Sequence, residues 1–239
     1  MKILVTSGGT KIPIDKVRDI TNMSTGTFGS KIATELLKLK HEVYFFKAKN
    51  SKSPYQINLD MRNDYATLSS FLYENYKNVA FFKDNYHEME YSTFDEYKER
   101  LERLLKMERP DVVVLAAAVS DYGVENPFNG KVRSNDMLSI KLVQLPKLIY
   151  LIKEWLPSAK VVGFKMLVNS TISKLIDAAN TSIYENKCDM IVANDLTEIR
   201  DGNHRVHLVF PEAVPLIYNT DPEDPNYLAR MVAENILKI

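Results

Sequence analysis

Cysteine is almost missing from this chain of 239 residues, since Cys188 is the single example. No disulfide can therefore form within the chain, and a reducing, cytoplasmic compartment is expected. The 4 histidines are not spaced as metal ligands, and Cys188 has no C-x-x-C partner, so no metal site is predicted. Apolar runs of about 18 residues, the length of a membrane span, are missing as well. No apolar signal-peptide region precedes the first predicted strand, so no membrane partner is expected.

An excess of charge of either sign is also missing, because 31 Lys and Arg residues balance 31 Asp and Glu residues. The chain thus has no general electrostatic basis for binding nucleic acid or an anionic membrane. A local basic pocket remains compatible with this balance, since net charge does not describe a single cleft. Hydrophobic residues make up 45% and charged residues 26%, as is ordinary for a globular protein with a core.

Segments with strand and helix patterns alternate along the chain. Strands are predicted at 2–6, 42–46, 79–82, 112–115, 139–143, 160–164, 190–193 and 206–210. Helices are predicted at 28–39, 64–76, 93–105, 146–155, 171–184 and 227–237. This order predicts one α/β domain, residues 1–239, with a three-layer Rossmann-like fold around a mostly parallel sheet. Residues 47–91 are the least periodic, and their aromatic part, 75–91, is interpreted as an insertion.

Glycine is scarce, yet four of the 8 glycines lie in the connection between the first strand and the first helix. They form two pairs, in TSGGT at 6–10 and GTFG at 26–29. Such a connection leaves N–H groups unpaired and lets an anion approach without Cβ obstruction. No glycine stands two residues before Gly26, so the G-x-G-x-x-G dinucleotide pattern is not met. The connection also carries polar side chains that a plain turn does not need, which favours anion binding: Asp15, Arg18, Asn22 and Ser24.

Small and polar residues follow three later strands, in AAAVSDY at 116–122, GFK at 163–165 and AND at 193–195. Ligands of α/β folds bind beyond the carboxyl ends of the strands, so these segments are expected on one rim with residues 7–9. Each has a structural alternative: Asp121 could cap a turn, Phe164 could complete the core, and Asn194-Asp195 could cap a turn. Lys131 and Arg133 share one side of an extended segment and could neutralise a triphosphate, or belong to a solvated loop.

Taken in order, these motifs resemble the family of phosphopantothenate–cysteine ligases, also called phosphopantothenoylcysteine synthetases. The series spans nearly the whole chain and is far more specific than any one motif. Because no flavoprotein decarboxylase domain precedes Met1, the stand-alone form is expected. The matching segments are TSGGT (6–10), PIDKVR (13–18), NMSTGTFG (22–29), AAAVSDY (116–122), KVRS (131–134), PKLI (146–149), GFK (163–165) and ANDL (193–196).

The resemblance implies a reaction of coenzyme A biosynthesis. The family joins 4′-phosphopantothenate to L-cysteine through an acyl-nucleotide intermediate and releases a nucleoside monophosphate and pyrophosphate. CTP or ATP would be the co-substrate, accompanied by Mg²⁺, and Asn194-Asp195 slightly favours CTP. Ser134 stands where bacterial fused enzymes usually carry a second lysine, so the choice of nucleotide stays open. A homodimer with a flap or dimerisation segment is also implied.

The resemblance further implies roles for single residues. The nucleotide site would be formed by Gly8, Ser24, Gly26, Gly29, Phe164 and Asn194. Phosphopantothenate and the acyl intermediate would contact Asn22, Ala117, Ala118 and Asp121. Arg18 would reach the substrate phosphate of the neighbouring subunit, and Lys131 would belong to the flap over the intermediate. The expected catalytic residues are Asn22, Lys131 and Asp121.

Two other classes of function remain open. An NAD(P)-dependent Rossmann-fold oxidoreductase would need G-x-x-x-G-x-G after the first strand and a late Tyr-x-x-x-Lys pair. The obvious pair of this kind, Tyr73 and Lys77, comes too early in the chain. A non-catalytic nucleotide-binding regulator is opposed only by the completeness of the motif series.

Overall fold

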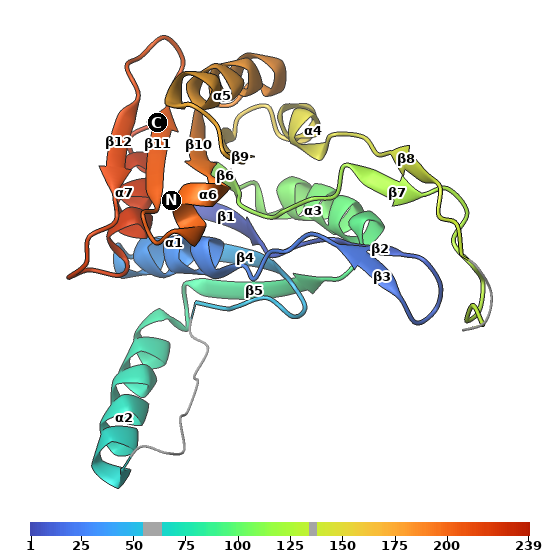
Figure 1. Cartoon of the computed structure of the whole chain (residues 1–239). Coiled ribbons are helices and arrows are strands. Elements are labelled where there is room, and N and C mark those ends of the chain that lie inside the picture. Colours follow the sequence, from blue (N-terminus) through green and yellow to red (C-terminus); the bar gives the residue numbers. More distant parts are fainter. Residues whose placement is uncertain (55–63, 134–137) are drawn as a thin grey trace.

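The computed structural model describes residues 1–54, 64–133 and 138–239. Its centre is an eight-stranded sheet in the order β12-β11-β10-β9-β6-β1-β4-β5 (Figure 1). The parallel strands are β1 (Lys2–Ser7), β4 (Glu42–Ala48), β5 (Tyr86–Tyr91), β6 (Val112–Leu115), β9 (Lys160–Leu167) and β10 (Met190–Asp195). The antiparallel strands at one edge are β11 (Arg205–Val209) and β12 (Leu216–Asn219). The predicted mostly parallel sheet is confirmed.

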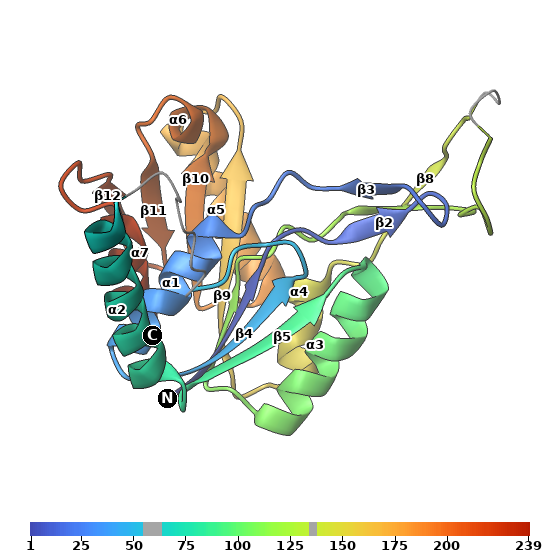
Figure 2. The same ribbon diagram turned by 90° about the horizontal axis from the view of Figure 1, so that it is seen from below.

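Helices cover both faces of this sheet, which confirms the three-layer fold (Figure 2). Alternate side chains of β1 point to opposite faces, so Ile3 and Val5 enter one core cluster and Leu4 enters the other. The first face is covered by α1 (Thr27–Lys38) and α7 (Tyr227–Ile236). The second is covered by α3 (Phe94–Glu108), α4 (Leu148–Trp155) and α5 (Ile172–Asn186).

The strand predicted at 79–82 is wrong, because these residues belong to helix α2 (Tyr65–Phe82). A short apolar run has the same pattern in a buried strand and in a helix, so periodicity alone could not separate them. The place beside β4 is taken instead by β5, a polar edge strand that the sequence did not reveal. Figure 1 shows α2 projecting from the body of the molecule. Within the segment 47–91, residues 55–63 lie outside the described part of the chain.

Two short hairpins lie outside the main sheet and project from it on the same side (Figures 1 and 2). One pairs β2 (Lys11–Pro13) with β3 (Asp19–Thr21), and the other pairs β7 (Tyr122–Val124) with β8 (Leu142–Gln144). The sequence predicted loops at the first three of these strands and a strand at 139–143 in place of β8. Strands of 3 residues are too short to show a period-two pattern, which explains the difference.

An aromatic cluster of Phe46, Tyr91 and Tyr97 lies beneath the end of β1. The ring centroids of Tyr91 and Tyr97 are 4.8 Å apart, and Phe46 stacks on Tyr97 at 5.5 Å. The Tyr91 hydroxyl donates to the Ser7 carbonyl at 2.7 Å, and the Tyr97 hydroxyl donates to Thr6 Oγ1 at 3.3 Å. Burial raises the pKa of both phenols, so they remain protonated donors. These bonds fix the strand end from which the glycine-rich connection starts.

We expect Tyr91→Phe to lower the free energy of unfolding by about 1–3 kcal/mol, because the buried Ser7 carbonyl loses its hydroxyl donor. Chemical denaturation followed by circular dichroism measures this difference. Tyr184→Phe is the matched control, since Tyr184 is 64% exposed. An unchanged stability of Tyr91→Phe would contradict the importance of this hydrogen bond.

Candidate functional site

The glycines after β1 allow three segments to close on one another. Gly8 and Gly26 have positive φ angles, +87° and +72°, which side-chain-bearing residues rarely adopt. A Cβ on Gly8 would stand 2.7 Å from Ser51 Cβ, and a Cβ on Gly26 would stand 2.8 Å from Ser7 Oγ. A Cβ on Gly29 would also meet Ser7 Oγ, at 2.7 Å. The end of β1, the turn after β4 and the start of α1 therefore touch because these positions lack side chains.

This close approach exposes the N-terminus of α1 at the rim of the sheet. Gly26 is the N-cap and supplies no side-chain cap, and the first turn carries no acidic residue. Uncapped N–H groups at a helix start, together with the positive end of the helix dipole, suit a phosphate. Ser24 lies half-buried in the preceding turn, where its amide donates to the Asn22 carbonyl at 2.8 Å. The predicted phosphate residues Gly8, Ser24, Gly26 and Gly29 thus belong to one connection.

The loop after β6 lies directly beside this connection. The Ala118 amide donates to the Gly8 carbonyl at 2.7 Å, and the Ala118 carbonyl accepts from the Thr10 amide at 3.2 Å. The same carbonyl accepts from Asn22 Nδ2 at 2.9 Å, which holds the exposed Asn22 side chain at the junction of the two loops. The structure therefore joins Asn22 to Ala118, and Ala117 precedes Ala118 in the same loop.

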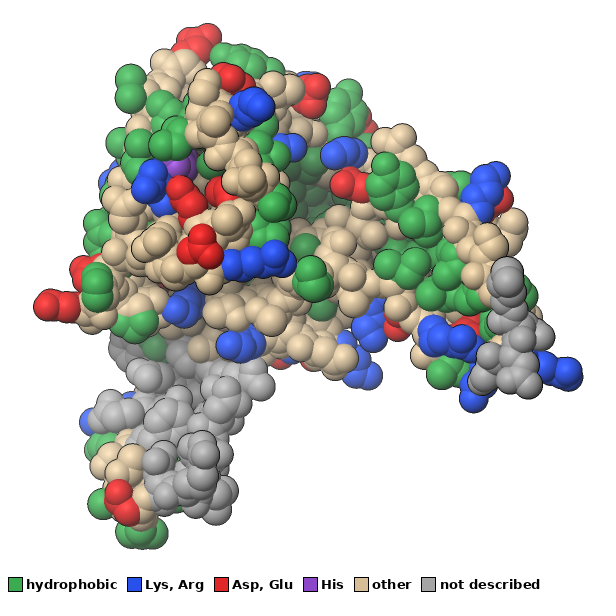
Figure 3. Space-filling model, viewed as in Figure 1, with side chains coloured by type: hydrophobic (Ala, Val, Ile, Leu, Met, Phe, Trp, Pro, Cys, Tyr) green, Lys and Arg blue, Asp and Glu red, His purple; other side chains and the backbone are tan. Residues whose placement is uncertain are grey.

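A cavity of about 180 Å³ opens at the carboxyl ends of β6 and β9, with Ala117, Asp121, Lys147 and Phe164 in its wall. Figure 3 shows a hollow between the end of the sheet and the projecting hairpins. Asp121 forms an ion pair with Lys147 at 3.5 Å, and each side chain is 61% exposed. The side-chain contact that the structure shows for Asp121 is this ion pair, and its role in binding a ligand stays a prediction.

Aromatic and amide side chains form a second part of the rim, above the start of α1. Phe164 meets Phe28 edge to face at 6.2 Å, and Phe28 meets the ring of His204 at 5.3 Å. Asn194, at the end of β10, is buried with 6% exposure, and its Nδ2 lies 2.9 Å from His204 Nε2. The sequence identified Phe164 and Asn194 but missed Phe28 and His204. Both could have been found only by knowing which loops meet at this rim.

Asp195 differs from its neighbour Asn194, because it is a structural cap. Its carboxylate accepts from the amides of Ser170 and Thr197, each at 2.8 Å, and so begins α6 (Leu196–Arg200) and ties down the preceding loop. The bond from the Ser170 amide lowers the pKa of Asp195 to about 2, with Thr197 acting in the same direction and burial opposing them. Asp195 therefore has the turn-capping role, and nucleotide binding by Asn194 stays a prediction.

Arg18 lies in the turn of the β2–β3 hairpin, where its side chain is held by its own chain. Its Nη2 atom is 3.0 Å from Asp15 Oδ2 and donates to the Val132 carbonyl at 2.6 Å. Asp15 also accepts from the Val132 amide at 3.1 Å. Burial raises the pKa of Asp15, but hydrogen bonds from the amides of Val17, Val132 and Arg18 together hold it below its usual value.

This contact places the predicted flap residue Lys131 next to the β2–β3 hairpin. The Gly130 carbonyl accepts from the Lys16 amide at 2.9 Å, and Lys16, Lys131 and Arg133 are exposed. Figure 3 shows Lys and Arg side chains gathered near this projecting end. Ser134 lies outside the described residues. The structure thus places this basic segment beside the β2–β3 hairpin, and its role as a flap stays a prediction.

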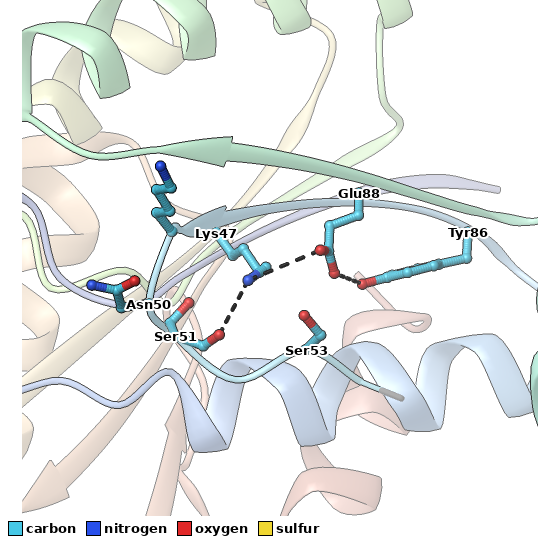
Figure 4. A pocket seen from close by; sticks show the side chains of 7 residues that line it. Lys47, Asn50, Ser51, Ser53, Tyr86 and Glu88 are labelled. Atoms are coloured by element: carbon cyan, nitrogen blue, oxygen red, sulfur yellow. Dashed lines mark hydrogen bonds and ion pairs between the residues drawn. The ribbon is translucent and has the colours of Figure 1, made fainter. Parts of the chain in front are cut away.

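A larger cavity of about 450 Å³, which the sequence did not indicate, lies beside the end of β4, the turn after it and the first half of β5 (Figure 4). The buried Lys47 Nζ is 3.2 Å from Glu90 Oε1 and donates to the Ser51 carbonyl at 3.2 Å. Glu88 lies 3.9 Å from the same amine and accepts a hydrogen bond from the Tyr86 hydroxyl. Because Ser51 also contacts the glycines of the first connection, Lys47 fixes the turn that packs on them.

Membrane-spanning helices and metal-binding clusters can be assessed only within the described part of the chain. Across residues 1–54, 64–133 and 138–239, no helix combines the length and apolar character needed to cross a membrane. The same residues hold no group of three or more His, Cys, Asp or Glu side chains suited to a metal ion. Cys188 lies in the core, and burial raises the pKa of its thiol to about 12, as expected of a core residue.

The sequence matches the family described as the DNA/pantothenate metabolism flavoprotein C-terminal domain over residues 1–67 and 84–238. The chain belongs to this family. It is 35% identical over 208 residues to the coenzyme A biosynthesis bifunctional protein CoaBC of Thermococcus kodakarensis, covering 87% of this chain and 44% of that protein. It is 28% identical over 226 residues to phosphopantothenate–cysteine ligase of Homo sapiens, covering 81% and 72%. The chain thus spans less than half the length of the CoaBC relative.

Solved structures agree with this family fold. The DNA/pantothenate metabolism flavoprotein from Streptococcus pneumoniae superimposes with a TM-score of 0.76 at 29% identity, covering 100% of this chain and 97% of that one. A Cab2 mutant in complex with phosphopantothenate-cysteine superimposes with a TM-score of 0.84 at 22% identity, covering 99% and 85%, a likeness that concerns the fold. Residues 68–83, which the family match leaves out, form most of α2 and overlap the segment interpreted as an insertion.

We expect Asp195→Asn to lower the urea midpoint at neutral pH, because the amide cannot replace both charge-assisted caps. The pKa of about 2 lies below the ordinary 3.8, so the carboxylate stabilises the fold above the ordinary value and loses this effect as the pH falls. The difference in urea midpoint between wild type and Asp195→Asn should therefore become smaller as the pH falls from about 5 towards 2. Asp84→Asn, at an exposed position, is the control. A pH-independent difference would contradict the role of the charge.

Proposed function

We propose that this protein is a phosphopantothenate–cysteine ligase of coenzyme A biosynthesis. The observation that carries the proposal is the hydrogen-bonded junction of Asn22, Gly8 and Ala118, which joins the glycine-rich connection to the second loop of the rim. It occurs in a chain whose family relatives include proteins named phosphopantothenate–cysteine ligase. Membership of this family gives no support to the oxidoreductase alternative.

The reaction would need two displacements. The carboxylate of 4′-phosphopantothenate attacks the α-phosphorus of the nucleoside triphosphate, forming an acyl-nucleotide and expelling pyrophosphate. The amine of L-cysteine then attacks the acyl carbon, and the nucleoside monophosphate leaves as the amide forms and a proton is released. Neither step needs a covalent enzyme nucleophile, so rate acceleration would come from positioning and from stabilising charge.

The first connection would hold the nucleotide phosphates. Gly8, Gly26 and Gly29 keep side chains away from the α1 N-terminus, and Ser24 borders it. A side-chain amide nitrogen carries two hydrogens, and Asn22 Nδ2 donates one of them to the Ala118 carbonyl. The second would be available to the acyl oxygen, where negative charge develops when the cysteine amine adds to the acyl carbon.

The neighbouring cavity would hold phosphopantothenate. Ala117 and Ala118 leave space against the backbone, and the exposed carboxylate of Asp121 can accept hydrogen bonds from substrate hydroxyl or amide groups. Phe164 would contact the base. Lys131, on the segment beside the hairpins, would close over the intermediate and offset its phosphate charge.

CTP or ATP would be the co-substrate, with Mg²⁺. The described residues present no cluster of metal-binding side chains, so we propose that the ion is carried by the triphosphate, as Mg²⁺ commonly is. Bound there, it would neutralise phosphate charge. Asn194 slightly favours CTP, and the slight preference rests on the family resemblance.

The proposed working unit is a cytoplasmic homodimer of a stand-alone ligase in which residues 1–239 act as one domain. The projecting hairpins would form the dimer contact, and Arg18 would bind the substrate phosphate in the neighbouring subunit. Its position at the tip of the β2–β3 hairpin supports this role, because that hairpin extends away from the body of its own chain (Figure 2).

Pyrophosphate release from the purified protein tests the reaction. We expect release with CTP or ATP only when 4′-phosphopantothenate is present, and product after L-cysteine is added. Asn22→Ala should lower product formation by about 100-fold or more, the usual effect of losing one oxyanion donor. Its nucleotide affinity should change little. Side-by-side rates with CTP and ATP decide the nucleotide.

Two outcomes would argue against the proposal. No pyrophosphate with either nucleotide would remove the ligase function, and preferential binding of NADPH in a fluorescence titration would favour an oxidoreductase. An equal loss of nucleotide binding and turnover in Asn22→Ala would make Asn22 structural.

A mixing experiment tests the role of Arg18 across the dimer. Arg18→Ala and Asn22→Ala homodimers should each be inactive. In a re-equilibrated equal mixture, the heterodimer has one site with both residues intact, so about one quarter of wild-type activity should return. Arg18 acting within its own subunit would give no recovery. Cross-linked homodimers that cannot exchange subunits are the control.

A further inference from the structure

The buried Asn194 and the half-buried His204 form a pair at the part of the rim where the nucleotide base would lie. Their closest polar atoms, Asn194 Nδ2 and His204 Nε2, are 2.9 Å apart. Asn194 comes from the carboxyl end of β10, and His204 precedes the antiparallel strand β11. The pair adjoins the aromatic contacts of Phe28 with His204 and of Phe28 with Phe164.

The backbone and the ring of His204 are both held in place. The His204 carbonyl accepts from the Thr220 amide at 3.0 Å, which anchors it between β11 and β12. Phe28 packs against the ring at 5.3 Å with an interplanar angle of 63°. A partner fixed in this way can select one orientation of the Asn194 amide group.

The contact itself gives that orientation, because Asn194 Nδ2 can only donate a hydrogen bond and His204 Nε2 must therefore accept it. Burial, followed by the positive charge of Lys31, lowers the pKa of His204, so the ring is neutral at physiological pH. A neutral ring with a proton on Nδ1 accepts at Nε2, and Asn194 Nδ2 is then the donor. Within the described residues no hydrogen bond occupies Asn194 Oδ1, so an acceptor remains on a side chain with little other freedom.

A free acceptor distinguishes nucleobases by the group they present to it. Cytosine and adenine carry an exocyclic amino group that can donate to Oδ1. Uracil carries a carbonyl oxygen at the equivalent position, and hypoxanthine carries one where adenine has its amino group. A base carbonyl at this position would face Asn194 Oδ1, so two acceptors would meet and neither would receive a hydrogen bond.

We propose that His204 is a positioning residue that orients the Asn194 amide so that the nucleotide site selects bases with an exocyclic amino group. This inference rests on the proposed function, since it identifies the base site with that of the ligase co-substrate. It explains why the half-buried His204 is paired with Asn194, whose neighbour Asp195 already acts as a cap.

The test compares wild type with His204→Ala and His204→Gln, using paired nucleotides that differ in one group: CTP against UTP, and ATP against ITP. Glutamine keeps a side-chain acceptor for Asn194 Nδ2, whereas alanine does not. His87→Ala is the matched control, because His87 lies on the edge strand β5. Thermal unfolding midpoints show whether each variant is folded.

Wild type should prefer CTP to UTP and ATP to ITP in kcat/KM for pyrophosphate release. His204→Ala should raise KM for CTP and ATP by about ten-fold, the value of one hydrogen bond, and should change kcat less. The CTP-to-UTP and ATP-to-ITP ratios of kcat/KM should fall in the same variant. His204→Gln should recover part of both ratios, and His87→Ala should leave them unchanged.

Equilibrium dialysis with the same four nucleotides separates this inference from the proposed function. Absence of pyrophosphate together with amino-selective binding that His204→Ala abolishes would remove the ligase reaction and keep the role of His204. Normal turnover with unaltered base ratios in a folded His204→Ala would overturn the inference and keep the ligase. Absence of amino-selective binding in wild type, or an equal loss for all four nucleotides in His204→Ala, would also overturn it.

Discussion

The close packing of backbone around Ser7 and Ser51 is the constraint on which the rest of the rim depends. Gly8, Gly26 and Gly29 stand where a Cβ would lie within 2.9 Å of one of these two serines. Their bare backbone lets the end of β1, the turn after β4 and the first turn of α1 meet. An uncapped helix start is thereby held rigidly at the edge of a parallel sheet, and its free N–H groups need no further reorganisation to meet an anion.

A second junction links the glycine-rich connection to the loop after β6, and two parts of the rim lie on either side of it. The Ala118 amide donates to Gly8 and its carbonyl accepts from Thr10 and Asn22, so three hydrogen bonds join the loops after β1 and β6. On one side of the junction lie the helix start and Phe28, and Phe164 contacts Phe28 while also lining the cavity on the other side. On the other lies the small cavity beside Asp121. A reaction between two bound molecules needs such neighbouring compartments with a shared wall.

The sequence predicted the parts of this arrangement that follow from chain connectivity. Buried strands such as 112–115 show continuous apolar runs, and residues just after them fall on the rim by topology. Prediction from the sequence failed where contacts between residues distant in sequence decide the local structure or the site. Val79 is apolar and yet helical, because β5 rather than its own segment pairs with β4. His204 could be identified only from its contacts with Phe28 and Asn194, since a lone histidine just before a strand has no local signal.

The Arg18 contact to the Val132 carbonyl has a consequence for communication between sites. In its own chain the guanidinium bridges the β2–β3 turn and the segment that carries Lys131. In the proposed dimer the same guanidinium would serve the neighbour's substrate, and it would have to loosen its hold on Val132 to do so. Substrate binding in one subunit and release of the flap in the other would then both depend on the Arg18 side chain. Such sharing is reciprocal, so flap closure in one subunit would alter the neighbour's affinity for phosphopantothenate by the same factor.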